Sequence, residues 1–156
     1  MQKAFLAVIA VGALVGLMWP TGDAPTSAAA VAPSSSEAKE TVIERSENGH
    51  FYANVEVNGE LVRFMVDTGA TTVAMTEKDA KRIGLAFSRK DYEEVGLGAG
   101  GPVRGLRVTL DKVAMDGKEV SGVHGTILEG GQMNLLGQDY LSRFSVEMRG
   151  DTMRIY

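Results

Sequence analysis

Apolar and polar residues alternate along the segment that begins at residue 51. The residues on its apolar face are Phe51, Ala53, Val55 and Val57. Asn58-Gly59 then separates this segment from a second β-rich run over residues 61–66. Asn-Gly is favoured in two-residue hairpin turns because both turn residues need positive φ. The pattern therefore predicts an antiparallel hairpin whose second strand ends at residue 66.

The following segments predict further short strands and few helices. Thr76, with Asp79 three residues later, is typical of a helix N-cap; the helix turns Ala80 and Ile83 toward the core and ends at Gly84. The remaining expected elements are strands at 103–115 and 120–128 about an Asp116-Gly117 turn, a helix at 138–144, and a hairpin of 145–148 and 152–156. Many short strands with one or two short helices predict a mostly β domain, closed or nearly closed into a small barrel.

The first 46 residues differ from the rest. After Lys3, residues 4–19 carry no charge and end at Trp19. As a helix this run would be about 24 Å long, short of the ~30 Å membrane core. We expect 1–19 to be an uncleaved membrane anchor with a cytoplasmic N-terminus. The alternative is a signal segment cut near Ala28–Ala32. Both place the following domain outside the inner membrane, in the periplasm or secreted.

Residues 20–46 are dominated by alanine, serine, threonine and proline without apolar periodicity. Such a segment buries too little apolar surface to offset its ordering entropy, so we expect a disordered tether. The globular domain is then expected at 47–156.

Composition excludes several function classes. Sixteen basic and twenty acidic residues give a net charge of −4, which disfavours nucleic acid as a partner. The chain has no cysteine, so it has no thiol nucleophile, disulfide or thiolate metal site. Its two histidines, His50 and His124, lack ligand spacing and are interpreted as surface or satisfied polar residues. We expect no metal and no organic cofactor. G-x-S-x-G and H-E-x-x-H patterns are also absent.

Asp67-Thr68-Gly69-Ala70 follows directly on the second predicted strand. A carboxylate that activates water needs a rigid support and free oxygens, and the end of a strand supplies both. Thr68 supplies a hydroxyl that can be buried against neighbouring backbone. Gly69 has no Cβ, so its N–H and another group can approach the carboxylate closely. The motif alone is also ordinary turn chemistry, and its weight comes from its surroundings.

Leu135-Leu136-Gly137 begins sixty-eight residues after Asp67. Together with the Asp-Thr-Gly motif it resembles the retropepsin-like aspartic proteases, over residues 47–156. The resemblance implies a small closed acid-protease barrel with one lobe per chain, and Leu135-Leu136-Gly137 as the structural loop beside the active site. It also implies that Asp67 is catalytic. Thr68 would brace the two active loops of a dimer, and Gly69 and Ala70 would line the floor.

The glycine-rich segment 96–101 fits G-x-G-x-x-G. That pattern indicates dinucleotide binding only where it opens a helix, and here Pro102 and a β-rich run follow. We interpret the segment instead as a hairpin tip that resembles the retropepsin flap, which closes over the substrate. Its expected tip residues are Gly98, Ala99, Gly100 and Gly101. A plain flexible turn is the alternative.

The chemistry implied by this resemblance requires two carboxylates, and the chain has one Asp-Thr-Gly. Two carboxyl groups about 3 Å apart cannot both be ionised, so the pair shares one proton. We therefore expect a homodimer with a two-fold axis between the two copies of Asp67. In retropepsins the chain termini interleave into an interface sheet, for which residues 152–156 and part of 47–53 are the matching candidates.

The sequence thus predicts an aspartic endopeptidase that hydrolyses extended protein substrates. Its expected location is the periplasmic face of the inner membrane. The alternative is a non-catalytic peptide-binding or dimerisation module with the same fold. A carbohydrate-active enzyme with two acids in one chain lacks a second carboxylate in a comparable setting.

Overall fold

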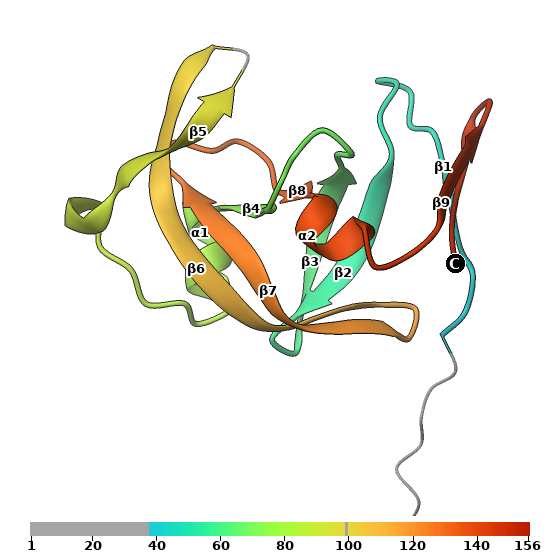
Figure 1. Ribbon diagram of the computed structural model, residues 1–156, viewed down its shortest axis with the longest axis horizontal. Helices are drawn as coiled ribbons and strands as arrows, with labels where there is room; N and C mark the ends of the chain where they lie inside the picture. The colour runs from blue at the N-terminus through green and yellow to red at the C-terminus, as the bar shows by residue number, and fades with distance from the viewer. Residues whose placement is uncertain (1–37, 99) are drawn as a thin grey trace, which may run out of the picture. The chain divides into compact units, whose positions relative to one another are not determined.

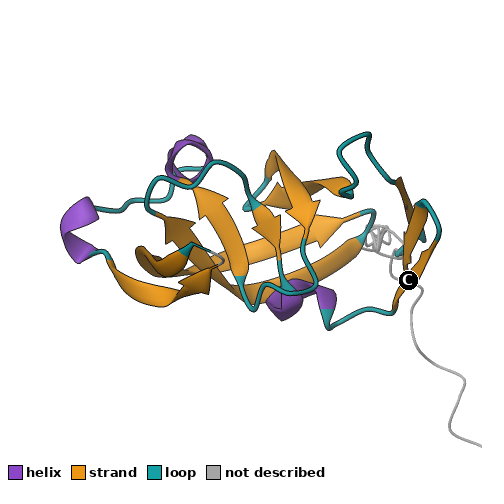
Figure 2. Cartoon of the chain, turned by 90° about the horizontal axis from the view of Figure 1, so that it is seen from above, coloured by secondary structure: helices purple, strands orange, loops and turns teal. Residues whose placement is uncertain are grey.

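The computed structural model describes residues 38–98 and 100–156 (Figure 1). Strands make up most of this part, and the helices are short and lie at its periphery (Figure 2). The elements are β1 (Thr41–Glu44), β2 (Tyr52–Val57), β3 (Glu60–Val66), β4 (Val73–Thr76), α1 (Glu77–Arg82), the 3-10 helix η1 (Arg89–Asp91), β5 (Glu93–Gly98), β6 (Gly101–Met115), β7 (Lys118–Leu128), β8 (Leu135–Leu136), α2 (Gln138–Leu141), β9 (Val146–Arg149) and β10 (Thr152–Ile155). The predicted mostly β class is confirmed.

The β2–β3 hairpin has the predicted turn and faces. Asn58 and Gly59 have φ of 51° and 90°, as a two-residue turn of this kind requires. Every second residue of both strands is buried, including Val55 and Phe64. The hairpin therefore fixes the end of β3, where Asp67 follows.

The large sheet has the strand order β2-β3-β8-β4-β7-β6-β5. It curls until β6 also pairs with β2, but only through Glu56↔Ala114 and Val57↔Val113. The N-terminal part of β6, up to Gly105, pairs with β5 instead. The prediction of a closed barrel is wrong in this respect: β5 takes part of β6, so the β2–β6 seam is short.

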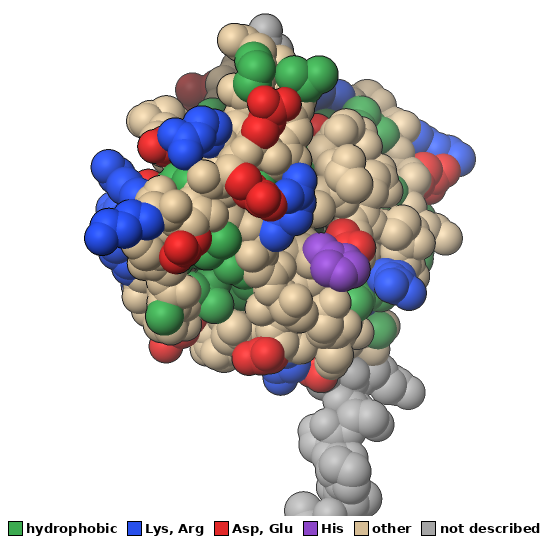
Figure 3. Space-filling model, turned by 60° about the vertical axis from the view of Figure 1, so that its left-hand side comes forward, with side chains coloured by type: hydrophobic (Ala, Val, Ile, Leu, Met, Phe, Trp, Pro, Cys, Tyr) green, Lys and Arg blue, Asp and Glu red, His purple; other side chains and the backbone are tan. Residues whose placement is uncertain are grey.

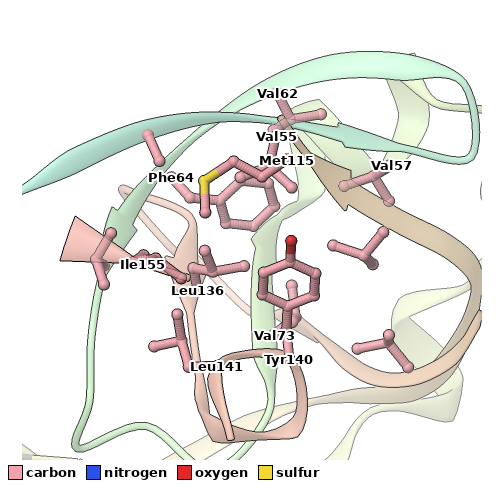
Figure 4. Close-up of a cluster of buried hydrophobic side chains, with 14 of the residues drawn as sticks. Val55, Val57, Val62, Phe64, Val73, Met115, Leu136, Tyr140, Leu141 and Ile155 are labelled. Carbon is pink, nitrogen blue, oxygen red and sulfur yellow. The ribbon is translucent and has the colours of Figure 1, made fainter. Parts of the chain in front are cut away.

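The core joins the hairpin to the C-terminal half of the chain. Figure 4 shows Leu136 of β8 and Tyr140 of α2 in one cluster with Val55 and Phe64. Tyr140 is fully buried, and its hydroxyl donates a hydrogen bond to the carbonyl oxygen of Lys118 over 2.7 Å. Burial raises the pKa of this hydroxyl, which therefore stays a neutral donor. Packing of Leu136 and Tyr140 in this core thus fixes the positions of β8 and α2.

Both helices begin at the residues expected from the sequence. The Thr76 hydroxyl accepts a hydrogen bond from the Asp79 N–H over 3.1 Å, and Gly84 follows α1 with a φ of 79°. The second helix, α2, is shorter than the predicted 138–144. After Leu141 the chain continues in turns, with the Phe144 N–H bonded to the Leu141 carbonyl three residues back.

β1 lies inside the segment predicted as a disordered tether, 20–46, so that boundary is wrong. It pairs antiparallel with β10, from Thr41↔Ile155 to Glu44↔Thr152. Thr41 and Ile43 are buried and the two intervening residues are exposed. This four-residue alternation is too short to stand out in an alanine- and serine-rich segment.

A separate three-stranded sheet results, with the order β1-β10-β9. Its central strand, β10, forms hydrogen bonds on both edges within its own chain. β10 therefore has no free edge for the interface sheet expected from residues 152–156 and 47–53. Among the described residues, the edge strands of this sheet are β1 and β9.

The expected anchor, residues 1–19, lies outside the described residues, as do the tether up to residue 37 and Ala99. Within 38–98 and 100–156, no helix combines the length and apolar character that crossing a membrane requires.

Candidate active site

Asp67 lies half-buried in a tight loop directly after β3. Its N–H donates to the Leu136 carbonyl over 3.1 Å, and its own carbonyl accepts from the Ala70 N–H over 3.2 Å. The carboxylate oxygen Oδ1 accepts a hydrogen bond from the Gly69 N–H over 2.9 Å. Oδ2 has no hydrogen-bond partner among residues 38–98 and 100–156. The loop therefore holds one oxygen in place and leaves the other available to a reactant.

β8 brings Leu135-Leu136-Gly137 beside this loop. Leu135 pairs in parallel with Met65 of β3 and antiparallel with Ala74 of β4, so β8 lies between the two strands that flank the Asp67 loop. Gly137 approaches the loop so closely that a Cβ there would lie 2.2 Å from the Thr72 carbonyl oxygen. The Ala70 carbonyl oxygen would lie 2.7 Å away, and both neighbours are backbone atoms, so this close fit depends on glycine at 137.

The start of α2 binds the carbonyl groups of the same loop. The N–H groups of Gln138 and Asp139 donate to the Ala70 and Thr71 carbonyls over 2.8 and 2.9 Å. The Gln138 side-chain amide donates to the Thr68 carbonyl over 2.8 Å. The sequence analysis did not identify Gln138, although its position directly after Leu-Leu-Gly was an available signal. The loop is thus held from three sides.

Thr68 differs from its expectation. We expected its hydroxyl to be buried against neighbouring backbone, but Thr68 is exposed in the single chain. Its carbonyl is the group that is bound, by Gln138. The reason is that the loop lies at the surface of this chain, with β8 and α2 on its inner side. A bracing role for the hydroxyl across a dimer axis stays a prediction.

His124 and Asp139 join β7 to α2. The His124 backbone N–H donates to Asp139 Oδ2, and the two side chains are in contact, with Nδ1 and Oδ2 3.2 Å apart. Burial raises the pKa of Asp139, but the hydrogen bonds from His124 together lower it by more. The pKa of Asp139 therefore lies below its ordinary value. The sequence placed Asp139 only within the helix expected at 138–144. Its contact with β7 depends on the tertiary fold.

Asp139→Asn is expected to change the pH dependence of stability. A carboxyl whose pKa is lower in the folded state stabilises the fold above its unfolded pKa of about 3.9, and loses this contribution as pH falls through the folded value. The stability deficit of Asp139→Asn should therefore be fully present at about pH 5 and shrink below about pH 4. Urea unfolding across this range measures it. Asp91→Asn on exposed η1 is the control, and a deficit that persists unchanged at low pH would contradict the assignment.

The β5–β6 hairpin contains the glycine-rich segment. Gly98 pairs with Gly101 and Leu97 with Pro102, and β6 begins directly at Gly101. The G-x-G-x-x-G pattern therefore ends one strand and begins the next, as predicted for a hairpin tip, and opens no phosphate-binding helix. Leu97 is 80% exposed near the tip, a feature that the sequence analysis did not single out. In Figure 1 this hairpin and the loop after β3 project on the same side of the molecule.

The other candidate groups are already engaged or dispersed. The carboxylate of Asp79 bonds to Thr76, Arg82 and Asn134, as that of Asp139 does to His124. In the described part of the chain, no three His, Cys, Asp or Glu residues gather as a metal site would require. Of Asp67, Asp79 and Asp139, only Asp67 keeps a carboxylate oxygen without a hydrogen-bond partner in the described part of the chain.

Residues 53–143, more than half of the chain, match the family model described as gag-polyprotein putative aspartyl protease. The chain is 37% identical over 111 residues to an uncharacterized protein of Rickettsia prowazekii (strain Madrid E), covering 70% of this chain and 48% of that protein. It is 29% identical over 120 residues to an uncharacterized protein from the cobV 5′ region of Sinorhizobium sp., covering 75% and 52%. The chain thus spans about half the length of these curated relatives.

A solved structure is also similar. It is the crystal structure of a retropepsin-like aspartic protease from Rickettsia conorii, with a TM-score of 0.64 and 32% identity. The similarity covers 75% of this chain and 90% of that one. With the Asp67 loop held between β3, β8 and α2, and with the family match over residues 53–143, this chain belongs to the retropepsin-like aspartic protease family.

Proposed function

We propose that the protein is an aspartic endopeptidase whose active site forms between two copies of the chain, each contributing one Asp67. The observation that carries this proposal is the geometry of the Asp67 loop. Oδ1 is fixed by the Gly69 N–H, and Oδ2 has no partner among the described residues. A structural aspartate would be expected to use both oxygens, as Asp79 and Asp139 do.

The second carboxylate comes from a second chain. Asp79 is held by an ion pair with Arg82 and Asp139 by hydrogen bonds from His124, so neither supplies the second carboxylate. A two-fold axis beside the exposed loop would instead bring two identical Asp67 side chains together, because such an interface pairs each surface with itself. The edge strands β1 and β9 offer free backbone groups for this association.

The reaction then needs no group beyond the two carboxylates and water. One Asp67 is ionised and takes a proton from the water held between them, while the protonated Asp67 of the partner subunit donates its proton to the carbonyl oxygen. The water oxygen bonds to the carbonyl carbon and forms a tetrahedral intermediate. This intermediate collapses as the C–N bond breaks and the nitrogen accepts a proton. One peptide gains a carboxyl group and the other an amine.

An extended peptide is the substrate that this site accommodates. β5 is the edge strand of the large sheet, and its hairpin projects on the side where the Asp67 loop lies (Figure 1). A peptide can add to such an edge through backbone hydrogen bonds. We assign Gly98, Gly100 and Gly101 to the flap, with exposed Leu97 as its apolar contact. The assignment extends to Ala99 from the sequence alone.

Incubation of the full chain with a mixed peptide library tests this function. Assayed across a range of pH, the chain is expected to cleave internal peptide bonds, because the proposed pair supplies a base for the water and an acid for the carbonyl oxygen. Mass spectrometry identifies the paired fragments. Retention of peptides without any cleavage would instead support the alternative, a non-catalytic peptide-binding module.

We also propose that the domain acts outside the inner membrane, on the strength of the uncharged run at 4–19 after Lys3. Alkaline phosphatase fused after Tyr156 tests export, because that reporter folds only in an oxidising compartment. An active fusion is expected. An inactive fusion together with an active cytoplasmic reporter at the same position would refute export.

A further inference from the structure

An open groove of about 990 Å³ lies on the outer face of the β2–β3 hairpin. Tyr52 of β2 and Arg63 and Met65 of β3 form its floor. One wall is the chain segment 45–48, and the other is the start of α1 with the loop 131–134. Asp67 itself does not line it, so the groove is a separate feature that begins two residues before the catalytic loop.

Buried and outward-facing side chains alternate along β3, and the outward-facing ones in the groove lead along the strand toward Asp67. Val62, Phe64 and Val66 are buried, so the residues between them face outward. Arg63 and Met65 lie on that outward side, and Asp67 follows two positions after Met65, just beyond the end of the strand. At about 3.3 Å per residue, Met65 lies ~7 Å and Arg63 ~13 Å from Asp67 along the chain. A substrate that extends from Asp67 along β3 would therefore cross Met65 first and Arg63 about four residues from the cleaved bond.

The groove contains positive charge that the fold does not neutralise. Among residues 38–98 and 100–156, Arg63 and Lys78 form no ion pair, whereas Arg45 is paired with Asp151 and Asp79 with Arg82. Glu47 is the one lining acid without an ion pair in the same part of the chain. On the face shown in Figure 3, basic and acidic side chains are interspersed. Among the described lining residues, the charges left without an ion pair are Arg63, Lys78 and Glu47, an excess of one positive charge.

Arg63 is also held in a defined position. Its guanidinium carbon lies 4.6 Å from the centre of the Tyr52 ring. Stacking on an aromatic ring orients a guanidinium and leaves its edge N–H groups free to bind a carboxylate in two-pronged geometry. The half-buried Met65 and the exposed Met133 supply apolar surface next to it. The groove thus combines an apolar part near Asp67 with a cation farther away.

We propose that this groove selects acidic substrates: Arg63 binds an aspartate or glutamate about four residues from the cleaved bond, and Lys78 adds to the attraction. An apolar side chain would lie nearer the bond, on Met65 and Met133. A two-fold dimer carries two such grooves, so an acid on either side of the bond would be recognised. The inference rests on the proposed peptidase function for its location relative to the cleaved bond.

A pair of peptides that differ only by glutamate or glutamine at that position tests it. We expect the full chain to cleave the glutamate peptide with roughly fivefold higher kcat/KM, the scale of a partly exposed, charge-assisted contact. Arg63→Gln should remove this preference, and Lys78→Gln should reduce it. Lys90→Gln, which removes an exposed cation of η1 outside the groove, should leave it intact. High salt should weaken the preference of the unmodified chain.

Charge reversal and a binding measurement complete the test. Arg63→Glu should favour a lysine at the same peptide position, which a merely structural role of Arg63 would not produce. In the Asp67→Asn background, fluorescence anisotropy should show tighter binding of the glutamate peptide than of the glutamine peptide. Equal cleavage and equal binding of both peptides would overturn the acidic preference and leave the peptidase intact. Selective binding of the acidic peptide without any cleavage by the unmodified chain would uphold the groove and refute the peptidase.

Discussion

Asp67→Asn is expected to lower kcat/KM for peptide hydrolysis by about 10³-fold or more, with little change in folding. Asparagine has the shape of aspartate, and its carbonyl oxygen can still accept the hydrogen bond from the Gly69 N–H, which spans 2.9 Å in the native loop. It cannot take a proton from water or carry one to the carbonyl oxygen of the substrate. The variant should therefore unfold at nearly the same urea concentration as the unmodified chain.

Asp91→Asn is the matched control for this substitution. Asp91 lies exposed on η1, distant in sequence from the loop, and its replacement by asparagine removes the same charge. Its kcat/KM should stay near that of the unmodified chain. If purified Asp67→Asn hydrolysed peptides at close to the unmodified rate, Asp67 would have no part in the mechanism.

Gly137→Ala is expected to give the largest loss of stability, about 3 kcal/mol or more. The new methyl carbon would lie 2.2 Å from the Thr72 carbonyl oxygen and 2.7 Å from that of Ala70. Both are backbone atoms in the loop that holds Asp67, so the loop must move away from β8. Hydrolysis should fall together with the free energy of unfolding, which urea titration measures.

Gly96→Ala in β5 separates this effect from the general cost of replacing glycine. A Cβ at Gly96 would meet no atom within 4 Å, and Gly96 does not need positive φ. Its free energy of unfolding should change by less than about 1 kcal/mol. A Gly137→Ala protein as stable and as active as Gly96→Ala would show that the close approach of β8 is dispensable.

The features predicted correctly from the sequence depend on neighbouring residues. Alternation and Asn58-Gly59 specify the β2–β3 hairpin, and Thr76 with Asp79 specifies the start of α1. Both signals act within a few residues, so one sequence is enough to read them. The strand that carries Asp67 to its loop was predictable for the same reason.

The features that were missed depend on contacts between distant segments. β1 is ordered because Thr41 lies opposite Ile155, more than a hundred residues later, and its own four residues give little signal. The Asp139–His124 pair and the contact of Gln138 with Thr68 need β7 and the loop after β3 to be placed first. The short β2–β6 seam likewise reflects competition with β5 for β6.

The central claim is that two Asp67 side chains, one from each chain, form one active site. Its most direct test is to hold the unmodified chain at constant concentration, add Asp67→Asn chain in increasing amount, and measure peptide hydrolysis. At a tenfold excess, random pairing leaves about one in eleven unmodified chains with an intact partner, so activity should fall roughly tenfold. Dilution of the unmodified chain alone should also lower its specific activity. A rate that is unaffected by the excess variant and proportional to concentration on dilution would contradict the claim, because each chain would then hold a complete site.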